Sequence, residues 1–235
     1  MKHVRKYLPI LLVLLLAIGM AGCGSSGGDT GDAGAASSSS ASADTSADTS
    51  TDTGDAASAE YEHGTIDGNV YTNDFFGFSF AIDDGWSFSD EEALRQLNQS
   101  VSDFLDNDSI TEALQSGQTF IDMQAANDSD PVNSINLTVS YAPGTAGIED
   151  INDASIKVMK NMYENAGFEN IEITKTKAKV NGGAVDALVT TLTQSDVDFC
   201  EKQFFLISGD YLGTITISGA SEEECDKLLS RISLK

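Results

Sequence analysis

The chain has few basic residues, few histidines and few cysteines, and each shortage excludes a class of protein. Its 235 residues include 13 Lys and Arg against 37 Asp and Glu, for a formal net charge of −24. A nucleic-acid-binding protein needs a basic face that displaces counterions, so we expect no nucleic-acid partner. Three cysteines cannot build a disulfide scaffold, and two histidines leave little room for zinc sites or histidine-based catalysis.

The first long apolar run, residues 8–20, is too short to cross a membrane. A spanning helix needs about 20 apolar residues, whereas this run has thirteen. Lys2, Arg5 and Lys6 precede it, and no acidic residue does. A basic start, a short apolar run and then small residues are typical of a secretory signal peptide.

The end of this run resembles the lipobox of bacterial lipoproteins. Met20-Ala21-Gly22-Cys23 has a large apolar residue, two small residues and a cysteine, although the family usually has Leu where Met20 stands. The resemblance covers residues 1–23. It implies that residues 1–22 are removed and that Cys23 carries diacylglycerol at the mature N-terminus. Each buried methylene contributes about 0.8 kcal/mol, so several acyl chains make a stable anchor. A plain signal peptide followed by a chance cysteine is the alternative.

Residues 24–58 contain only Gly, Ser, Thr, Ala and Asp, with a near repeat of four residues at 42–53. Such a composition cannot bury enough apolar surface to offset the entropy of ordering. We therefore predict a disordered tether over 23–59, with an average span of about 30 Å. It would hold the remaining residues, 60–235, away from the membrane.

Residues 60–235 have the composition of one folded domain, because aromatic residues appear and apolar residues become periodic. Alternation predicts strands at 76–82, 86–88, 118–126, 135–141, 171–180, 184–193, 199–207 and 211–218. Helical spacing predicts helices at 90–105, 148–166 and 221–232, and a helical turn at 110–115. Ser89 with Glu92, and Ser221 with Glu224, form capping-box patterns at the start of the first and last helices.

The order of these elements favours an antiparallel sheet. Consecutive strands are joined by short glycine-containing turns at 181–183 and 208–210, whereas parallel strands need long crossovers. Helices would then cover the sheet. We predict an α+β domain in which an antiparallel β-sheet is flanked by helices as an α/β/α sandwich.

This order, with Gly77-Phe78-Ser79-Phe80-Ala81-Ile82 and Gly85-Trp86 near its start, is similar to the PsbP/Mog1-like family. The similarity extends over roughly residues 69–235. That family commonly has a proline between its first long strand and the tryptophan, where this chain has Asp83 and Asp84. The resemblance implies a helix–sheet–helix sandwich of a kind that serves binding and assembly, and implies little about activity.

Cys200 and Cys225 are the two cysteines of the predicted domain. The first lies in a predicted strand and the second on the apolar stripe of the last predicted helix. Packing of that helix on the sheet could bring them within bonding distance, and export permits a disulfide. A loop of about 25 residues closed in this way would contribute about 3 kcal/mol. Two buried thiols that pack as small hydrophobic groups are the alternative.

Lys175, Lys177 and Lys179 alternate along one predicted strand and form the basic stripe of an acidic domain. The stripe could bind an anion or dock a partner. Alternatively, it protects an edge strand from aggregation. Trp86 with Phe75 and Phe76 could similarly line a ligand groove, or could pack in the core.

Acidic clusters offer two further possibilities. Asp103, Asp106 and Asp108, and separately Asp128 and Asp130, could supply oxygen ligands to calcium, although neither matches a known calcium loop. Solvated turns on an acidic surface are the alternative. Paired carboxylates could also act as acid and base, as in glycosidases.

The predicted domain holds no recognisable catalytic or cofactor motif. It has no HExxH, GxSxG, Walker A or dinucleotide pattern, so we assign no catalytic residue, metal ligand or cofactor. We expect a non-enzymatic binding or assembly module, lipid-anchored at the extracytoplasmic face of the cell membrane of a Gram-positive bacterium, with a protein or small-molecule partner. The alternatives are an extracytoplasmic hydrolase that uses paired carboxylates and a calcium-binding surface protein.

Overall fold

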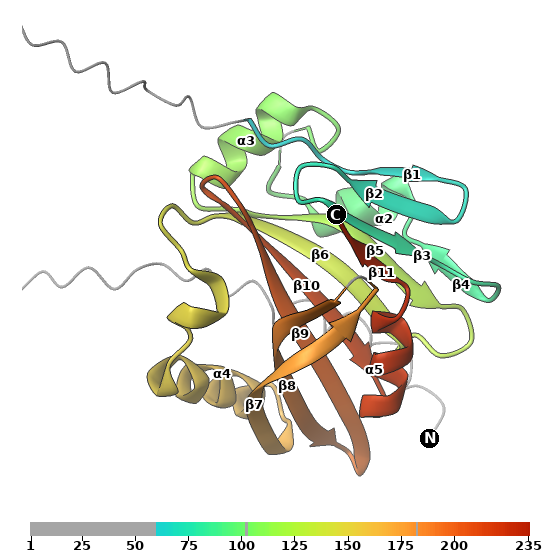
Figure 1. The fold of residues 1–235 in the computed structure, drawn as a ribbon, viewed down its shortest axis with the longest axis vertical. Helices are drawn as coiled ribbons and strands as arrows, with labels where there is room; N and C mark the ends of the chain where they lie inside the picture. The colour runs from blue at the N-terminus through green and yellow to red at the C-terminus, as the bar shows by residue number, and fades with distance from the viewer. Residues whose placement is uncertain (1–59, 102, 182) are drawn as a thin grey trace, which may run out of the picture.

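The computed structural model describes residues 60–101, 103–181 and 183–235, which form two antiparallel β-sheets with helices packed against them (Figure 1). The predicted signal peptide, the lipid attachment at Cys23 and the tether over 23–59 lie outside these residues. None of the helices in the described ranges is long and apolar enough to cross a membrane.

The larger sheet has seven strands in the order β4-β5-β6-β10-β9-β8-β7. Their bounds are β4 Trp86–Phe88, β5 Thr119–Asn127, β6 Ser134–Tyr141, β7 Glu169–Val180, β8 Gly183–Gln194, β9 Val197–Ser208 and β10 Tyr211–Gly219. Neighbouring strands run antiparallel throughout. Ser195 and Asp196 join β8 to β9 with positive φ, which a two-residue hairpin turn requires. Local turns thus make β7 to β10 a meander, as the sequence predicted.

The smaller sheet has four strands in the order β1-β2-β3-β11. Their bounds are β1 Thr65–Asp67, β2 Val70–Asn73, β3 Phe78–Ala81 and β11 Ile232–Leu234. The sequence pattern predicted only β3 of these strands. Its assignment of Ile232 to the last helix was wrong, because that helix, α5 (Glu222–Leu229), ends earlier and the chain then pairs with β3 as β11.

The first and last helices begin at side-chain caps near the predicted positions. In α5, Ser221 accepts the backbone N–H of Glu224, as the capping-box pattern predicts. In α2 (Glu91–Leu97), the prediction was off by one residue. Asp90, rather than Ser89, caps the helix by accepting the N–H of Ala93 at 2.8 Å.

Two predicted helices have different bounds in the structure. The helix predicted over 90–105 ends at Leu97, and α3 (Asn107–Gln115) begins after a turn. The helix predicted over 148–166 is a 3₁₀ turn, η2 (Gly147–Asp150), followed by α4 (Asp153–Asn165). The separate helical turn predicted at 110–115 lies within α3. The apolar spacing continues past Leu97 and across the break before α4, which explains why the first helix was predicted too long and why η2 and α4 were predicted as one helix.

The seven-stranded sheet has an apolar cluster on each face. Phe199 and Cys200, which are neighbours on β9, belong to different clusters and therefore point to opposite faces. One face packs against the smaller sheet, α3 and α5, and the other against α4. Figure 1 shows α4 and the smaller sheet at opposite ends of the molecule. The structure confirms the predicted α+β class, with an antiparallel sheet flanked by helices.

Candidate functional site

β7 is an edge strand of the seven-stranded sheet, and its inner side pairs with β8. Within the described residues, no backbone hydrogen bond joins the outer side of β7 to another segment. Just beyond the strand, the N–H of Asn181 donates to Ile232 O at 3.0 Å and closes that end. The 12-residue strand therefore presents unpaired N–H and C=O groups that another chain could pair with.

The three predicted lysines lie on this edge strand, and all three are exposed. Lys177 forms an ion pair of 2.7 Å with Asp186, its direct neighbour on β8. Lys175 donates to the carbonyl oxygen of Ile148 in η2 at 2.9 Å. Lys179 makes no ion pair with any described residue. The structure thus confirms that the stripe marks an edge, which both the docking and the edge-protection interpretations require.

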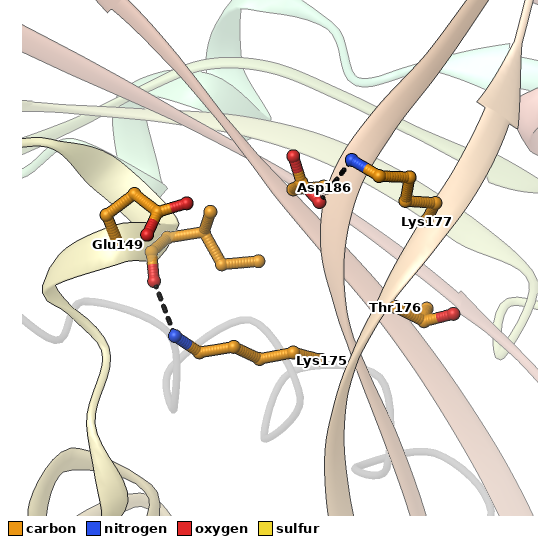
Figure 2. Close-up of a pocket in the computed structure, with 6 residues that line it drawn as sticks. Glu149, Lys175, Thr176, Lys177 and Asp186 are labelled. Atoms are coloured by element: carbon orange, nitrogen blue, oxygen red, sulfur yellow. Dashed lines mark hydrogen bonds and ion pairs between the residues drawn. The ribbon is translucent and has the colours of Figure 1, made fainter.

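A shallow, open pocket of about 330 Å³ lies between η2 and the β7–β8 pair. It is lined by Ile148, Glu149, Lys175, Thr176, Lys177 and Asp186. Figure 2 shows Glu149 and Lys175 on one side of the pocket and Lys177 with Asp186 on the other. The lining supplies charge of both signs, and both of its lysines are engaged, Lys177 with Asp186 and Lys175 with the carbonyl oxygen of Ile148.

The two cysteines of the domain lie together in the structure. Cys200 on β9 and Cys225 on α5 are both buried, and both thiols are free. The Cys225 thiol donates to the carbonyl oxygen of Cys200 at 3.3 Å. Hydrogen bonding with the other thiol lowers the pKa of Cys200 and raises that of Cys225. The sequence thus predicted correctly that helix-on-strand packing brings the pair together.

Three of the aspartates considered for calcium accept hydrogen bonds from the chain around them. Asp106 caps α3, and Asp103 accepts the N–H of Leu105 in the preceding turn. Asp130 accepts the side-chain amide of Asn133. In the part of the chain that the structure describes, no group of three or more Asp, Glu, His or Cys could hold a metal. Asp103, Asp106 and Asp130 thus act as turn and cap residues here.

The aromatic residues considered for a ligand groove pack against the core instead. The ring of Phe75 is 5.1 Å from that of Tyr61 and 5.5 Å from that of Tyr211, centroid to centroid. Trp86 packs against the same core cluster, with the guanidinium of Arg231 5.5 Å from its ring centroid. This arrangement matches the core-packing alternative.

Sequence reasoning missed a buried carboxyl group at Asp122 on β5, which is 7% exposed. It accepts hydrogen bonds from the hydroxyls of Tyr61 (2.7 Å) and Tyr71, the side-chain amide of Asn73 (2.8 Å) and the backbone N–H of Gly64 (2.9 Å). Burial, and then the nearby Asp122, raise the pKa of both tyrosines well above 10. We call these five residues the Asp122 cluster. It fastens the start of the described chain to the larger sheet.

A second buried carboxyl group, Glu201 on β9, was also missed. Tyr163 of α4 donates to its Oε2 at 2.6 Å, whereas its Oε1 has no described partner. The neighbouring hydroxyl of Thr190, opposite Glu201 on β8, is also buried without a clear acceptor or donor. Burial raises the pKa of Glu201 to about 7. The only sequence signal was an acidic residue in the middle of a strand, between Cys200 and Lys202.

No protein-family model matches the chain, and no curated protein matches it in sequence. Its fold is similar to the solution structure of cyanobacterial PsbP (CyanoP) from Synechocystis sp. PCC 6803. That similarity has 13% identity and a TM-score of 0.44, and covers 71% of this chain and 91% of CyanoP.

The fold is also similar to a crystal structure of a protein from Bacteroides thetaiotaomicron. This second similarity has 9% identity and a TM-score of 0.36, and covers 72% of this chain and 49% of that protein. The chain therefore spans about half of the Bacteroides protein. Both TM-scores are below 0.5, so neither similarity assigns the chain a family or a function.

Proposed function

We propose that the protein is a lipid-anchored binding module of the extracytoplasmic membrane face, which docks an acidic partner along β7. The observation that carries the proposal is the free edge of β7 with its three exposed lysines. The domain around this edge is strongly acidic. Of the 37 acids and 13 bases in the chain, residues 1–59 contain six and three, which leaves 31 acids and 10 bases.

An extended acidic segment is the partner chemistry that fits the edge. Its backbone would add a strand to β7, while acidic side chains on one face would lie beside the lysines. The net charge of −21 that these counts give the domain would oppose such a partner at a distance. At physiological ionic strength the Debye length is about 8 Å, so the nearby lysines dominate once the strands approach.

The anchor part of the proposal rests on residues 1–23. The charge of the domain opposes adsorption to an anionic membrane surface, so electrostatic attraction would not hold it there. An acylated Cys23 would supply the attachment, and residues 24–58 would supply the distance from the bilayer.

The docking part is tested with a fluorescein-labelled ten-residue peptide of alternating Glu and Val. We expect its anisotropy to rise with the wild-type protein, and its Kd to increase at least about tenfold in the Lys175→Glu/Lys177→Glu/Lys179→Glu variant. The matched control carries the same charge change at Lys157, Lys160 and Lys227. Equal weakening in both variants, or no binding to wild type, would contradict docking at β7.

The anchor part is tested separately by mass spectrometry of the mature protein. A chain that begins at acylated Cys23 and fractionates with membranes is expected. Cys23→Ala should release the protein or leave it unprocessed. A mature, membrane-bound chain with an unmodified Cys23 would contradict the anchor and leave the docking proposal intact.

A further inference from the structure

The two cysteines lie where α5 packs against β9. Cys200 and Cys225 are 2% and 0% exposed, and the Cys225 Sγ lies 3.3 Å from the carbonyl oxygen of Cys200. Both thiols are therefore held in one small volume that solvent does not reach.

The backbone opposite Cys200 leaves room for the second sulfur. Gly219 of β10 is the direct partner of Cys200 in the antiparallel register. A Cβ added at Gly219 would lie 3.3 Å from the Cys225 Sγ and 3.2 Å from the Cβ of Glu224. Glycine at this position thus keeps free the space into which Cys225 projects.

An ion pair fixes how α5 sits on β9. Lys202 lies two residues from Cys200 on the same face of β9, and its Nζ is 2.6 Å from the Oδ1 of Asp226, the residue after Cys225. The Lys202 side chain is only 7% exposed. Although burial opposes it, the Asp226 carboxylate raises the pKa of Lys202. This ion pair joins the segments that carry the two cysteines.

We infer that Cys200 and Cys225 form a disulfide, made by exchange with a disulfide oxidant while α5 is undocked, and that it fastens α5 to the sheet. The Cys225 thiolate first attacks the oxidant, which yields a mixed disulfide and one free thiolate. The Cys200 thiolate then attacks the Cys225 sulfur and releases the second thiolate. Two protein thiols lose two protons and two electrons, and the oxidant is reduced to two thiols. The oxidising compartment rests on the proposed export, whereas the pairing itself does not.

The test refolds the full chain from denaturant with oxidised glutathione and maps its peptides without reduction. We expect a peptide that links Cys200 to Cys225, and no alkylation of either residue by iodoacetamide after denaturation. Closing a 25-residue loop should raise Tm by about 6–12 °C relative to the same protein with reductant. Cys225→Ala should remove this dependence on reductant.

The peptide map decides the result even if the variant folds poorly. Complete alkylation of Cys200 and Cys225 after refolding, or a link from either one to Cys23, would overturn the inference. Because glutathione supplies the oxidant in solution, a negative result would count against the pairing alone and would leave export untouched.

Discussion

The two buried carboxyl groups of this domain have opposite surroundings. Asp122 accepts four hydrogen-bond donors, and every one of these contacts leads to the N-terminal part of the domain. Glu201, on the opposite face of the sheet, has one donor and one oxygen without a described partner. Burial costs a carboxylate free energy in both places, but only Asp122 recovers it through hydrogen bonds. We therefore regard Asp122 as a structural hydrogen-bond acceptor, and Glu201, whose pKa burial raises to about 7, as a group that titrates near neutral pH.

The largest effect is expected from Asp122→Ala. The change leaves two tyrosine hydroxyls, an amide and a backbone N–H without their acceptor, so the free energy of unfolding should fall by about 3–5 kcal/mol. Urea unfolding measures this loss, with the exposed Asp128→Ala as the matched control. A similar, small loss in both variants would mean that the Asp122 cluster does not fasten the start of the described chain to the larger sheet.

The second-largest effect is expected from Glu201→Gln, which should change how the free energy of unfolding depends on pH. The folded pKa of Glu201, about 7, lies above its ordinary value of 4.5. The raised pKa therefore stabilises the folded state fully below about pH 4.5, where Glu201 is protonated. This stabilisation is lost as the pH rises through 7. The loss amounts to about 3 kcal/mol by pH 8. Relative to the wild type, the glutamine variant should gain stability between pH 5 and pH 8. Parallel pH curves for the two proteins would disprove this.

Two tyrosine variants compare the surroundings of Asp122 and Glu201 directly. Tyr61→Phe leaves Asp122 with three donors and should cost about 1 kcal/mol. Tyr163→Phe removes the only described donor to Glu201, so it should cost about 1–3 kcal/mol at pH 8 and less at pH 5. Chemical unfolding at the two pH values distinguishes them. Equal costs at both pH values for Tyr163→Phe would show that Glu201 is not titrating.

The smallest effect is expected at Lys177 on the edge strand β7. This exposed residue serves as the reference against which the buried carboxyl groups are compared. Lys177→Ala breaks the ion pair with Asp186, but both side chains are at least half exposed. The free energy of unfolding should therefore change by less than about 0.5 kcal/mol. A thermal melt in 0.15 M salt is sufficient. A loss above about 1 kcal/mol would imply that β7 needs its lysines to stay folded.

The parts of this fold that the sequence predicted depend on local signals. The meander from β7 to β10 follows from alternation and short turns, and the lysine stripe was visible within five residues. The smaller sheet was not predictable, because β1 has three exposed residues and β11 pairs with a strand about 150 residues earlier in the chain. The buried carboxyl groups were missed for the same reason: the partners of Asp122 lie 49 to 61 residues away, and Tyr163 lies 38 residues from Glu201.

The Asp122 cluster also determines how the domain would bear a mechanical load. Tension applied through the residues before Glu60 reaches the domain at Tyr61 and Gly64, before the short strands β1 and β2. Without the cluster, that tension would unzip the β1–β2 hairpin one hydrogen bond at a time. With it, the pull passes through Asp122 into β5 and is spread over the seven-stranded sheet. The first rupture under force should therefore be the loss of the bonds that Tyr61 and Gly64 make to Asp122.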